Sequence, residues 1–389
     1  MLRAAGVPYW RLSSVYFFYF ALLGAWLPFW NLYLADRGFD ADTIGLLSAI
    51  TMGTKVIAPA LWSWLAEKLR RHILFIQLGS ALTLATVLLV LLEPTSTQMV
   101  AVVFIYSFFW NAVLPQFEAV TVEHLGEHTD RYSEIRLWGS VGFIVAVLIL
   151  GWVFDWLAIT YLPWFFVAIL VALTVSSFSI TEPASWHGQE PSVISIKELF
   201  RCRILWAFMA AMFFQQLSHG PYYAFFSLHL ETFDYSKFVI GLLWALGVVA
   251  EIVLFMVMAR LLPMFGLKSL LVVALLLSVL RWVLIAYLAH SWPVMIFAQI
   301  LHAASFGVCH AAAVDYIRQH FSAAPALGQA VYNGVSFGLG GAIGALLSGW
   351  IWHLGGHWVF VLSALASLFA VILVIMFYSE ASVAEQSPK

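Results

Sequence analysis

The chain has 389 residues, of which 63% are hydrophobic and only 10% are charged, and its mean hydropathy is +0.94. Soluble domains carry roughly 25% charged residues, so this composition excludes a soluble globular protein. The net charge of -2 offers no basic patch for nucleic acid, and Cys202 and Cys309 match no metal or redox spacing. The composition predicts a polytopic protein of the lipid bilayer with no cofactor, no metal site and no nucleic-acid partner.

Long apolar segments alternate with short polar ones along the chain. A membrane-crossing helix needs about 20 mostly apolar residues, whereas a β-barrel would show short alternating segments. The predicted fold class is therefore an all-α membrane protein with twelve transmembrane helices. We expect these helices at residues 10–35, 43–66, 72–92, 97–120, 136–158, 161–180, 204–231, 238–260, 267–289, 292–319, 325–353 and 357–378.

One long polar interval divides the spans into six and six. The predicted domains are an N-terminal six-helix half at 1–180, a cytoplasmic central loop at 181–203, a C-terminal six-helix half at 204–378 and a polar C-terminal tail at 379–389. With a cytoplasmic N-terminus, 14 of the 18 basic residues fall on the cytoplasmic side. Because cytoplasmic loops are enriched in Lys and Arg, we expect both termini in the cytoplasm.

Few charged residues lie inside the apolar spans of the first half. Lys55 lies about twelve residues into the second span, near the middle of the membrane. Glu118 and Arg136 flank a short polar link between the fourth and fifth spans. An ionisable group at membrane depth usually faces a cavity and has a partner, so we pair Glu118 with Arg136 as a substrate-binding site. Lys55 is a candidate cation facing the central cavity, suited to an anionic carboxylate substrate. The alternatives are a structural Glu118–Arg136 ion pair and a Lys55 that reaches back to a carbonyl or to Glu251.

The second half has a charged group of its own. Glu251 and Arg281 each lie about thirteen residues into neighbouring antiparallel spans, so they reach a similar depth. With His302 they form a candidate protonation site, and His310 follows about two turns later on the same helix face. The alternative is a neutral packing pair. His219, just before Gly220 and Pro221, predicts a broken turn in the seventh span.

Aromatic residues make up 16% of the chain. Tyr19, Trp30 and Tyr223 are candidates to line an aromatic cavity around a substrate. The alternative is that they serve only in packing or in the interfacial belt, where most aromatic residues of a membrane protein lie.

The two halves repeat each other. A shift of about 196 residues places the segment IGLL at 44–47 on the same four residues at 240–243, and Gly24 on Gly220. This register pairs the first span with the seventh. Two parallel six-helix halves with a site between them are the architecture of major facilitator transporters.

Several stretches carry polar or aromatic residues at particular places: LPFW (27–30), TIGLL (43–47), RLWGSVGF (136–143), LGVVAE (246–251), SVLRW (278–282), QILH (299–302), VCHAAA (308–313) and QAVY (329–332). With these stretches the chain resembles the 3-phenylpropionate transporter group of the major facilitator superfamily, which is close to the lactose permease-type oligosaccharide:proton symporters. The resemblance runs nearly end to end. It implies the twelve-helix facilitator fold, the bacterial inner membrane and a monomer.

The resemblance also implies roles for individual residues. Glu118 and Arg136 match the sugar-binding Glu and Arg of the lactose permeases, while Arg281 and His302 match their buried Arg and His. The carboxylate three residues after that His, which resembles the proton-releasing group of the permeases, is absent, because Ser305 stands there. The eighth-span Glu of the permeases has no equivalent at the matching position, but Glu251 lies about one turn further on.

The sequence therefore predicts a secondary transporter and not an enzyme. Its expected partners are a small molecule, favoured as an aromatic carboxylate such as 3-phenylpropionate, and protons, with Glu251, Arg281, His302 and His310 in coupling. One alternative is an oligosaccharide:proton symporter. Another is a membrane receptor of transporter shape, which would show no uptake.

Overall fold

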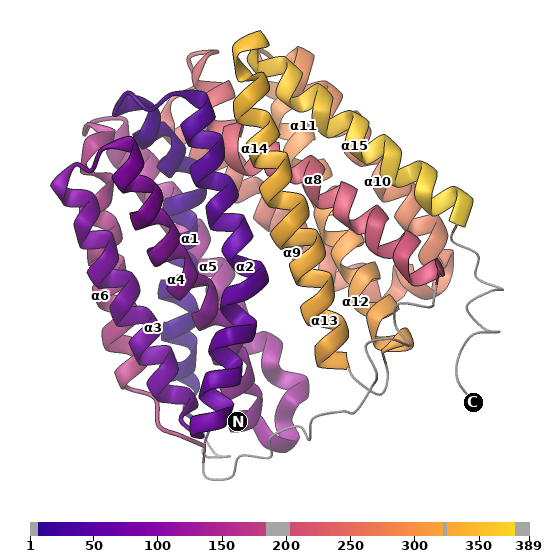
Figure 1. Ribbon diagram of the computed structural model, residues 1–389. Helices are drawn as coiled ribbons and strands as arrows, with labels where there is room; N and C mark the ends of the chain where they lie inside the picture. Colours follow the sequence, from indigo (N-terminus) through magenta and orange to yellow (C-terminus); the bar gives the residue numbers. More distant parts are fainter. Residues whose placement is uncertain (1–6, 184–202, 322–324, 378–389) are drawn as a thin grey trace. The chain divides into compact units, whose positions relative to one another are not determined.

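The computed structural model describes residues 7–183, 203–321 and 325–377, and these residues are mostly helical (Figure 1). Their contacts define two compact units. The first is Met1–Gly188 with Asp234–Ala245, and the second is Gln189–Phe233 with Leu246–Lys389. Most of the expected central loop and the whole of the expected tail lie outside the described residues, so the predicted domain boundaries stay a prediction.

Long helices joined by short turns build the first unit. In chain order they are α1 (Tyr9–Asp36), α2 (Ala41–Leu69), α3 (His72–Val87) with η2 (Leu88–Leu92), α4 (Ser96–Leu125), η3 (Gly126–Arg131), α5 (Tyr132–Phe154), η4 (Ile159–Tyr161) and α6 (Leu162–Phe178). Polar residues begin two of them. The Asp40 side chain accepts a hydrogen bond from Thr43 N at 2.8 Å at the start of α2, and Thr95 and Gln98 form a capping box at the start of α4.

The second unit holds α8 (Arg203–Glu231), most of α9 (Lys237–Phe265), α10 (Leu267–Leu288), α11 (Trp292–His302), α12 (Cys309–His320), α13 (Pro325–Asn333), α14 (Gly341–Ile351), η7 (Trp352–Leu354) and α15 (Gly356–Phe377). Two π-helical segments interrupt it. The segment η5 (Ala303–Val308) joins α11 to α12, and η6 (Gly334–Gly340) joins α13 to α14. π-helical turns are rare and occur frequently at functional sites.

The prediction of a broken turn at His219 is wrong, because α8 runs without interruption through Pro221. A proline removes the N–H that would bond the carbonyl four residues earlier, here Leu217. Gly344 packs directly against that carbonyl, and Gly220 packs against the backbone of Gly341. These glycines let the backbones of α8 and α14 touch at this crossing.

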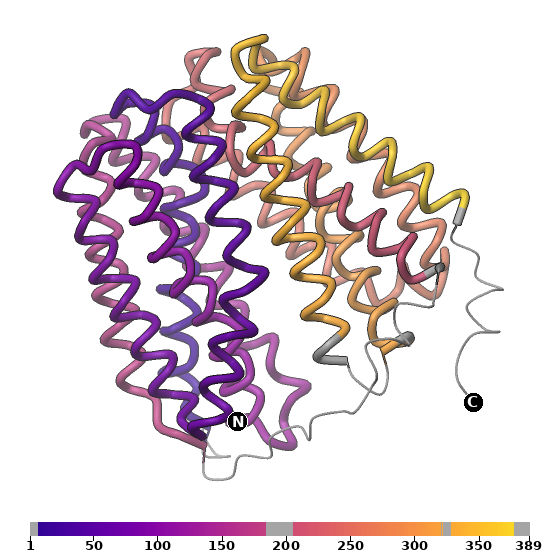
Figure 2. Tube along the Cα trace, viewed as in Figure 1, coloured from indigo at the N-terminus to yellow at the C-terminus, as the bar shows by residue number. Residues whose placement is uncertain are grey.

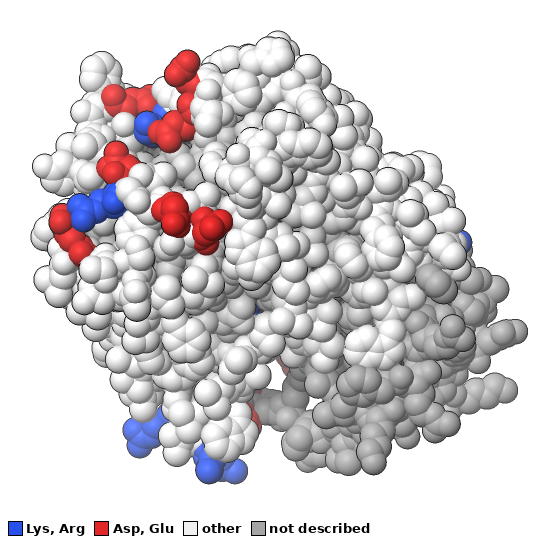
Figure 3. All heavy atoms as spheres, turned by 45° about the horizontal axis from the view of Figure 1, so that its top comes forward, with Lys and Arg blue, Asp and Glu red and all other residues white. Residues whose placement is uncertain are grey.

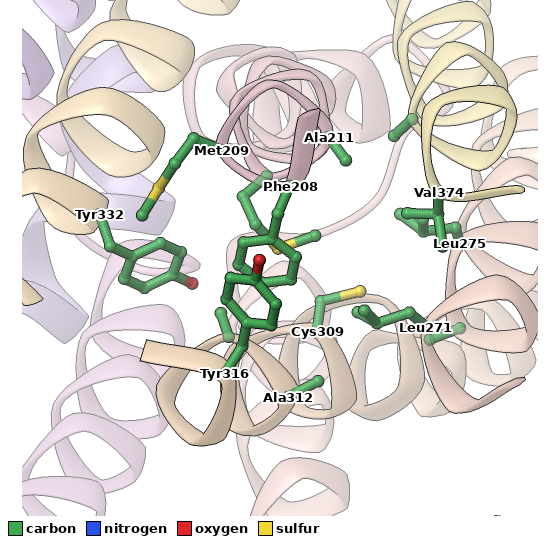
Figure 4. Packing of buried hydrophobic residues seen from close by; sticks show 14 of the residues in the cluster. Phe208, Met209, Ala211, Leu271, Leu275, Cys309, Ala312, Tyr316, Tyr332 and Val374 are labelled. Carbon is green, nitrogen blue, oxygen red and sulfur yellow. The ribbon is translucent and has the colours of Figure 1, made fainter. Parts of the chain in front are cut away.

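A buried apolar cluster forms the core of the second unit. Figure 4 shows Phe208 and Tyr316 facing each other at its centre, and their rings stack with centroids 3.9 Å apart. Leu271, Leu275 and Cys309 surround them. In Figure 2, α8 and α15 run beside each other along this core, and the two helices are in contact.

Ten segments of the described chain are long and apolar enough to cross a membrane. One of them, Ser96–Phe154, contains both α4 and α5, and α8 is not among the ten. The prediction of a multi-pass all-α membrane protein is confirmed, while the number twelve stays a prediction. In Figure 3 most charged side chains on the face shown gather at the upper left and the lower left, and the surface between these two groups is largely uncharged, as expected of a surface that faces lipid.

Candidate functional site

The first charged centre lies where α4 and α5 of the first unit approach the same place. Arg136 Nε lies 3.9 Å from Glu118 Oε1, and their side chains are 31% and 40% exposed. The distance is within ion-pair range but too long for a hydrogen bond. Among the described residues, the Arg136 guanidinium has no hydrogen-bond acceptor, so its five N–H donors are open to another group.

Aromatic side chains from α1 form one wall of this centre. The Arg136 guanidinium lies 4.0 Å from the centre of the Phe20 ring and 5.6 Å from that of Tyr16. Such stacking stabilises a cation over the ring face. Tyr16 also donates toward Tyr132 at 3.2 Å, and Tyr132 hydrogen-bonds Glu118. The centre therefore combines an open cation, a carboxylate and ring faces.

Glycines allow α1 to approach α5 closely enough for this arrangement. A Cβ added to Gly142 of α5 would meet the backbone of Phe17, and one added to Gly24 of α1 would meet the backbone of Phe143. Small residues at such crossings let helix backbones touch. Gly139 lies beside both Phe20 and Arg136, so a larger side chain there would displace the stacked pair.

Lys55 lies on α2 of the same unit and is half-buried. Its Nζ lies 3.6 Å from the sulfur of Met52, which is a weak acceptor for an ammonium. No carboxylate of the described residues lies within ion-pair distance of it. A cation held this way at membrane depth is unfavourable in free energy unless an anion binds beside it.

Two predicted aromatic contacts of the first unit are buried. Tyr19 is 5% exposed and donates to the carbonyl of Trp110 at 3.3 Å. Trp30 is 1% exposed and stacks on Tyr33 with ring centroids 5.4 Å apart. Tyr19 also packs against Phe20, so it supports the ring under Arg136 from behind.

The second charged centre, in the second unit, is closed around Arg281. This side chain is 0% exposed, and its guanidinium lies 4.3 Å from the ring centres of both Tyr222 and Trp282. It donates to Ala298 O at 3.0 Å, to Ser305 Oγ at 3.2 Å and to Gln299 Oε1 at 3.4 Å. Among the described residues, no carboxylate lies within ion-pair distance of Arg281.

Glu251 approaches His302 instead. Its Oε2 lies 3.9 Å from His302 Nε2, and the two side chains are 18% and 8% exposed. His302 stacks on Phe306, which stacks on His310, with centroid separations of 5.4 and 6.0 Å. His302 and His310 therefore lie on one helix face, and His310 Nδ1 lies 3.4 Å from the Tyr332 hydroxyl.

Tyr223 lies at the edge of this second centre. Its ring centroid is 5.6 Å from that of Tyr222 and 6.0 Å from that of His219. Four buried polar atoms around Arg281 have no hydrogen-bond partner among the described residues. They are Gln215 Oε1, His219 Nε2, Gln299 Nε2 and His302 Nδ1.

Sequence reasoning missed several of these neighbours. Gln299 lies in the QILH stretch, and Ser305 was noticed only as the residue that replaces a carboxylate, yet both accept hydrogen bonds from Arg281. Arg281 lies on another helix, α10, so the sequence around 299–305 carries no signal for these contacts. Tyr132 lies in the polar link, and no pattern there indicates that its hydroxyl meets Glu118.

The fold agrees with known transporters over nearly the whole chain. The crystal structure of the nucleoside transporter NupG (D323A mutant) matches with a TM-score of 0.85, covering 95% of this chain and 99% of that one at 18% identity. The fold is that of a major facilitator transporter. The profile of the MFS_1 like family matches residues 9–362, and the chain belongs to that family, whose members are transporters and not enzymes.

Curated relatives share more of the sequence. The "Probable 3-phenylpropionic acid transporter" of Escherichia coli (strain K12) is 28% identical over 370 residues, which cover 93% of this chain and 96% of that protein. The "Maltose permease" of Geobacillus stearothermophilus is 27% identical over 360 residues, which cover 89% of each chain. The predicted family is confirmed, and the chain is a multi-pass membrane transporter of small molecules.

Proposed function

We propose that this protein imports a small aromatic carboxylate such as 3-phenylpropionate across the bacterial inner membrane, by alternating access and together with protons. In this proposal it acts as a monomer with both termini in the cytoplasm. One observation carries the substrate class: the half-exposed Arg136 guanidinium lies 4.0 Å over Phe20 and has no hydrogen-bond acceptor among the described residues.

An aromatic carboxylate has the two features that this centre complements. Its carboxylate can accept two parallel hydrogen bonds from a guanidinium, which is the strongest common pairing of an arginine. Its ring can pack against aromatic side chains in offset or edge-on geometry. In the proposal Arg136 binds the carboxylate, Glu118 shares the site, and Tyr19 and Trp30 shape its aromatic wall.

Lys55 contributes selection for negative charge. The Lys55 ammonium has a thioether contact and no carboxylate partner among the described residues. Its charge therefore raises the positive potential around it. In a low-dielectric cavity such a charge attracts an anion several-fold more strongly than in water. The similarity to a probable 3-phenylpropionic acid transporter supports the same substrate class.

Proton coupling is proposed for the second unit. Glu251 lies 3.9 Å from His302, and the neighbouring polar atoms without partners provide sites for protons or water. Arg281 balances the charge of Glu251 within this centre, and His310 extends it along the helix. Tyr223, at the edge of the centre, is proposed to touch the substrate.

The second candidate is an oligosaccharide:proton symporter. It is favoured by the similarity to a maltose permease and by the loose Glu118–Arg136 pair, whose charged groups could bond sugar hydroxyls. Glu118, a carboxylate beside the site, disfavours binding of an anion and can accept hydrogen bonds from sugar hydroxyls. Both properties are physical arguments for this alternative.

The test is binding and uptake by the purified protein in detergent and in proteoliposomes. The probes are 3-phenylpropionate, its neutral alcohol 3-phenylpropanol, and maltose. We expect 3-phenylpropionate to raise the melting temperature and to be taken up when the outside is acidic. Stabilisation by maltose alone would favour the sugar symporter, and stabilisation without any uptake would favour a transporter-shaped receptor.

A further inference from the structure

Glu118 and Arg136 are close enough to attract each other, but they are not joined by a hydrogen bond. Their nearest atoms are 3.9 Å apart, and both side chains remain partly exposed. Glu118 has a second support in the Tyr132 hydroxyl, so its position does not depend on Arg136 alone. Separation of the pair therefore breaks no hydrogen bond between the two groups.

From this geometry we propose that Glu118 takes up a proton when a substrate carboxylate binds Arg136, so that the pair itself couples substrate to proton. The inference rests on the proposed function, because it requires an anionic substrate. It places the step that couples one proton to one substrate in the first unit, and the group around Glu251 is the alternative that the test distinguishes.

Charge counting gives the reason. The empty pair is neutral, and an incoming carboxylate would place two negative charges beside one guanidinium. Two carboxylates that share one site disfavour each other's charged form, so one of them becomes protonated. At membrane depth the repulsion is only weakly screened, which makes the neutral state strongly preferred.

The step is balanced in charge and atoms. A proton from water bonds to a Glu118 carboxylate oxygen, the Glu118–Arg136 ion pair is lost, and an ion pair between Arg136 and the substrate forms. The new Glu118 O–H can donate to the substrate carboxylate. Release on the cytoplasmic side reverses every change, and one proton leaves with one substrate.

Among the ionisable groups around this site, Glu118 is the one that we expect to gain and lose the proton. Arg136 is the described cation within ion-pair distance of it. The other ionisable groups that face it are the hydroxyls of Tyr132 from α5 and of Tyr16 and Tyr19 from α1. Phenol groups ordinarily stay neutral below about pH 10, so they do not titrate in the working range.

The test measures proton uptake on binding. Purified protein in weakly buffered solution with a pH-indicator dye is mixed with 3-phenylpropionate between pH 6 and pH 8.5. We expect the wild type to take up about one proton per substrate, and its affinity to fall by up to about tenfold per pH unit. Glu118→Gln mimics the protonated state, so it binds with little pH dependence, takes up no proton and fails to accumulate substrate.

Two variants control the result. Glu134→Gln changes an exposed carboxylate that pairs with Arg131 at 2.7 Å in the same link, and it should keep the proton uptake of the wild type. Tyr132→Phe removes the hydroxyl that supports charged Glu118, so the fall in affinity should begin at higher pH. This second variant tests the proposal without altering any formal charge.

The outcomes separate the two proposals. If the wild type binds no aromatic acid at any pH, the proposed function fails and this inference fails with it. If the wild type binds but Glu118→Gln keeps its proton uptake, the function stands and the coupling role of Glu118 is wrong. Loss of all binding in folded Glu118→Gln also overturns the inference, since the neutral side chain is the form that binds. Loss of proton uptake in Glu251→Gln alone would place coupling in the second unit.

Discussion

Arg136 in the first unit and Arg281 in the second both lie in apolar helices and both stack on aromatic rings. Arg281 is 0% exposed and donates to three acceptors, whereas Arg136 is partly exposed and has no hydrogen-bond acceptor among the described residues. A guanidinium whose donors are used internally holds helices together. One whose donors are open can bind an incoming carboxylate, and this contrast is the reason for proposing substrate recognition in the first unit.

The carboxylates near the two arginines differ in the same way. Glu118 faces its arginine directly at 3.9 Å, while Glu251 approaches a histidine at the same distance. A substrate at Arg136 therefore competes with Glu118 itself. At Glu251 any effect of the substrate must pass through a rearrangement of His302 or Arg281, as coupling by population shift requires.

Substitution of Arg281, whose guanidinium donates to acceptors inside the protein, should have the largest effect, and this effect should be on stability. Arg281→Gln leaves the acceptors Ala298 O and Ser305 Oγ without their charged donor inside the core. Hydrogen bonds to charged groups contribute about 1.5–3 kcal/mol each, so we expect a loss of about 3 kcal/mol in stability. Thermal unfolding in detergent measures it, and Arg136→Gln, which breaks no such bond, is the matched control. Equal melting temperatures for the two variants would contradict the contrast between the centres.

Substitution of Arg136, whose donors have no acceptor among the described residues, should instead weaken substrate binding. Arg136→Gln removes the donors proposed for the substrate carboxylate, which corresponds to about 1.5–3 kcal/mol or a roughly 10- to 150-fold weaker affinity. The protein should remain folded because no internal hydrogen bond is lost. Binding of 3-phenylpropionate by isothermal calorimetry is the measurement. Normal uptake by this variant would remove Arg136 from the substrate site.

Lys55→Gln should produce a smaller and more selective loss. The half-buried ammonium acts on the substrate charge and not on the ring, so affinity for 3-phenylpropionate should fall by roughly tenfold. Binding of 3-phenylpropanol should change little. The ratio of the two affinities separates the roles, and an equal loss for both ligands would show that Lys55 is structural.

Hydropathy was enough to predict several helices of this protein because a membrane span needs about 20 mostly apolar residues. The first predicted span, 10–35, corresponds to α1 at Tyr9–Asp36, and the fifth, 136–158, to α5 at Tyr132–Phe154. The pairing of Glu118 with Arg136 was predictable too, since a short link must bring its two ends together.

The surroundings of Arg281 could not be predicted in the same way. In a helix that is apolar all round, the pattern does not show which face meets which neighbour. Gln299 and Ser305 became partners of Arg281 through packing between α10, α11 and η5, which leaves no periodic signal. Gly344, more than one hundred residues away from Pro221, likewise packs against the Leu217 carbonyl of α8 without any local sequence signal.

A third charged pair, Arg37 with Glu93, lies outside the apolar spans. Of the charged groups compared here, it is the one whose substitution should have the smallest effect. Arg37 Nη1 donates to Glu93 Oε1 at 2.9 Å, with side chains 27% and 66% exposed. The hydrogen bond and the charge of Arg37 lower the pKa of Glu93 from its ordinary value of 4.5. A carboxyl whose folded pKa is depressed stabilises the protein above its unfolded pKa, and this contribution disappears as the pH falls through the folded value.

Glu93→Gln should therefore lower the melting temperature slightly at pH 7, and the difference from the wild type should shrink below about pH 4.5. Both side chains face water, where salt screens the attraction, so the effect should also fade at high ionic strength. Melting curves at pH 7 and pH 4, at low and high salt, provide the measurement. The backbone of Glu93 has a φ of 53°, and Gln keeps the same side-chain length and branching, so backbone strain does not enter the comparison. A difference in melting temperature that grows as the pH falls would contradict this prediction. It would show that the charged Glu93 carboxylate does not stabilise the protein through Arg37.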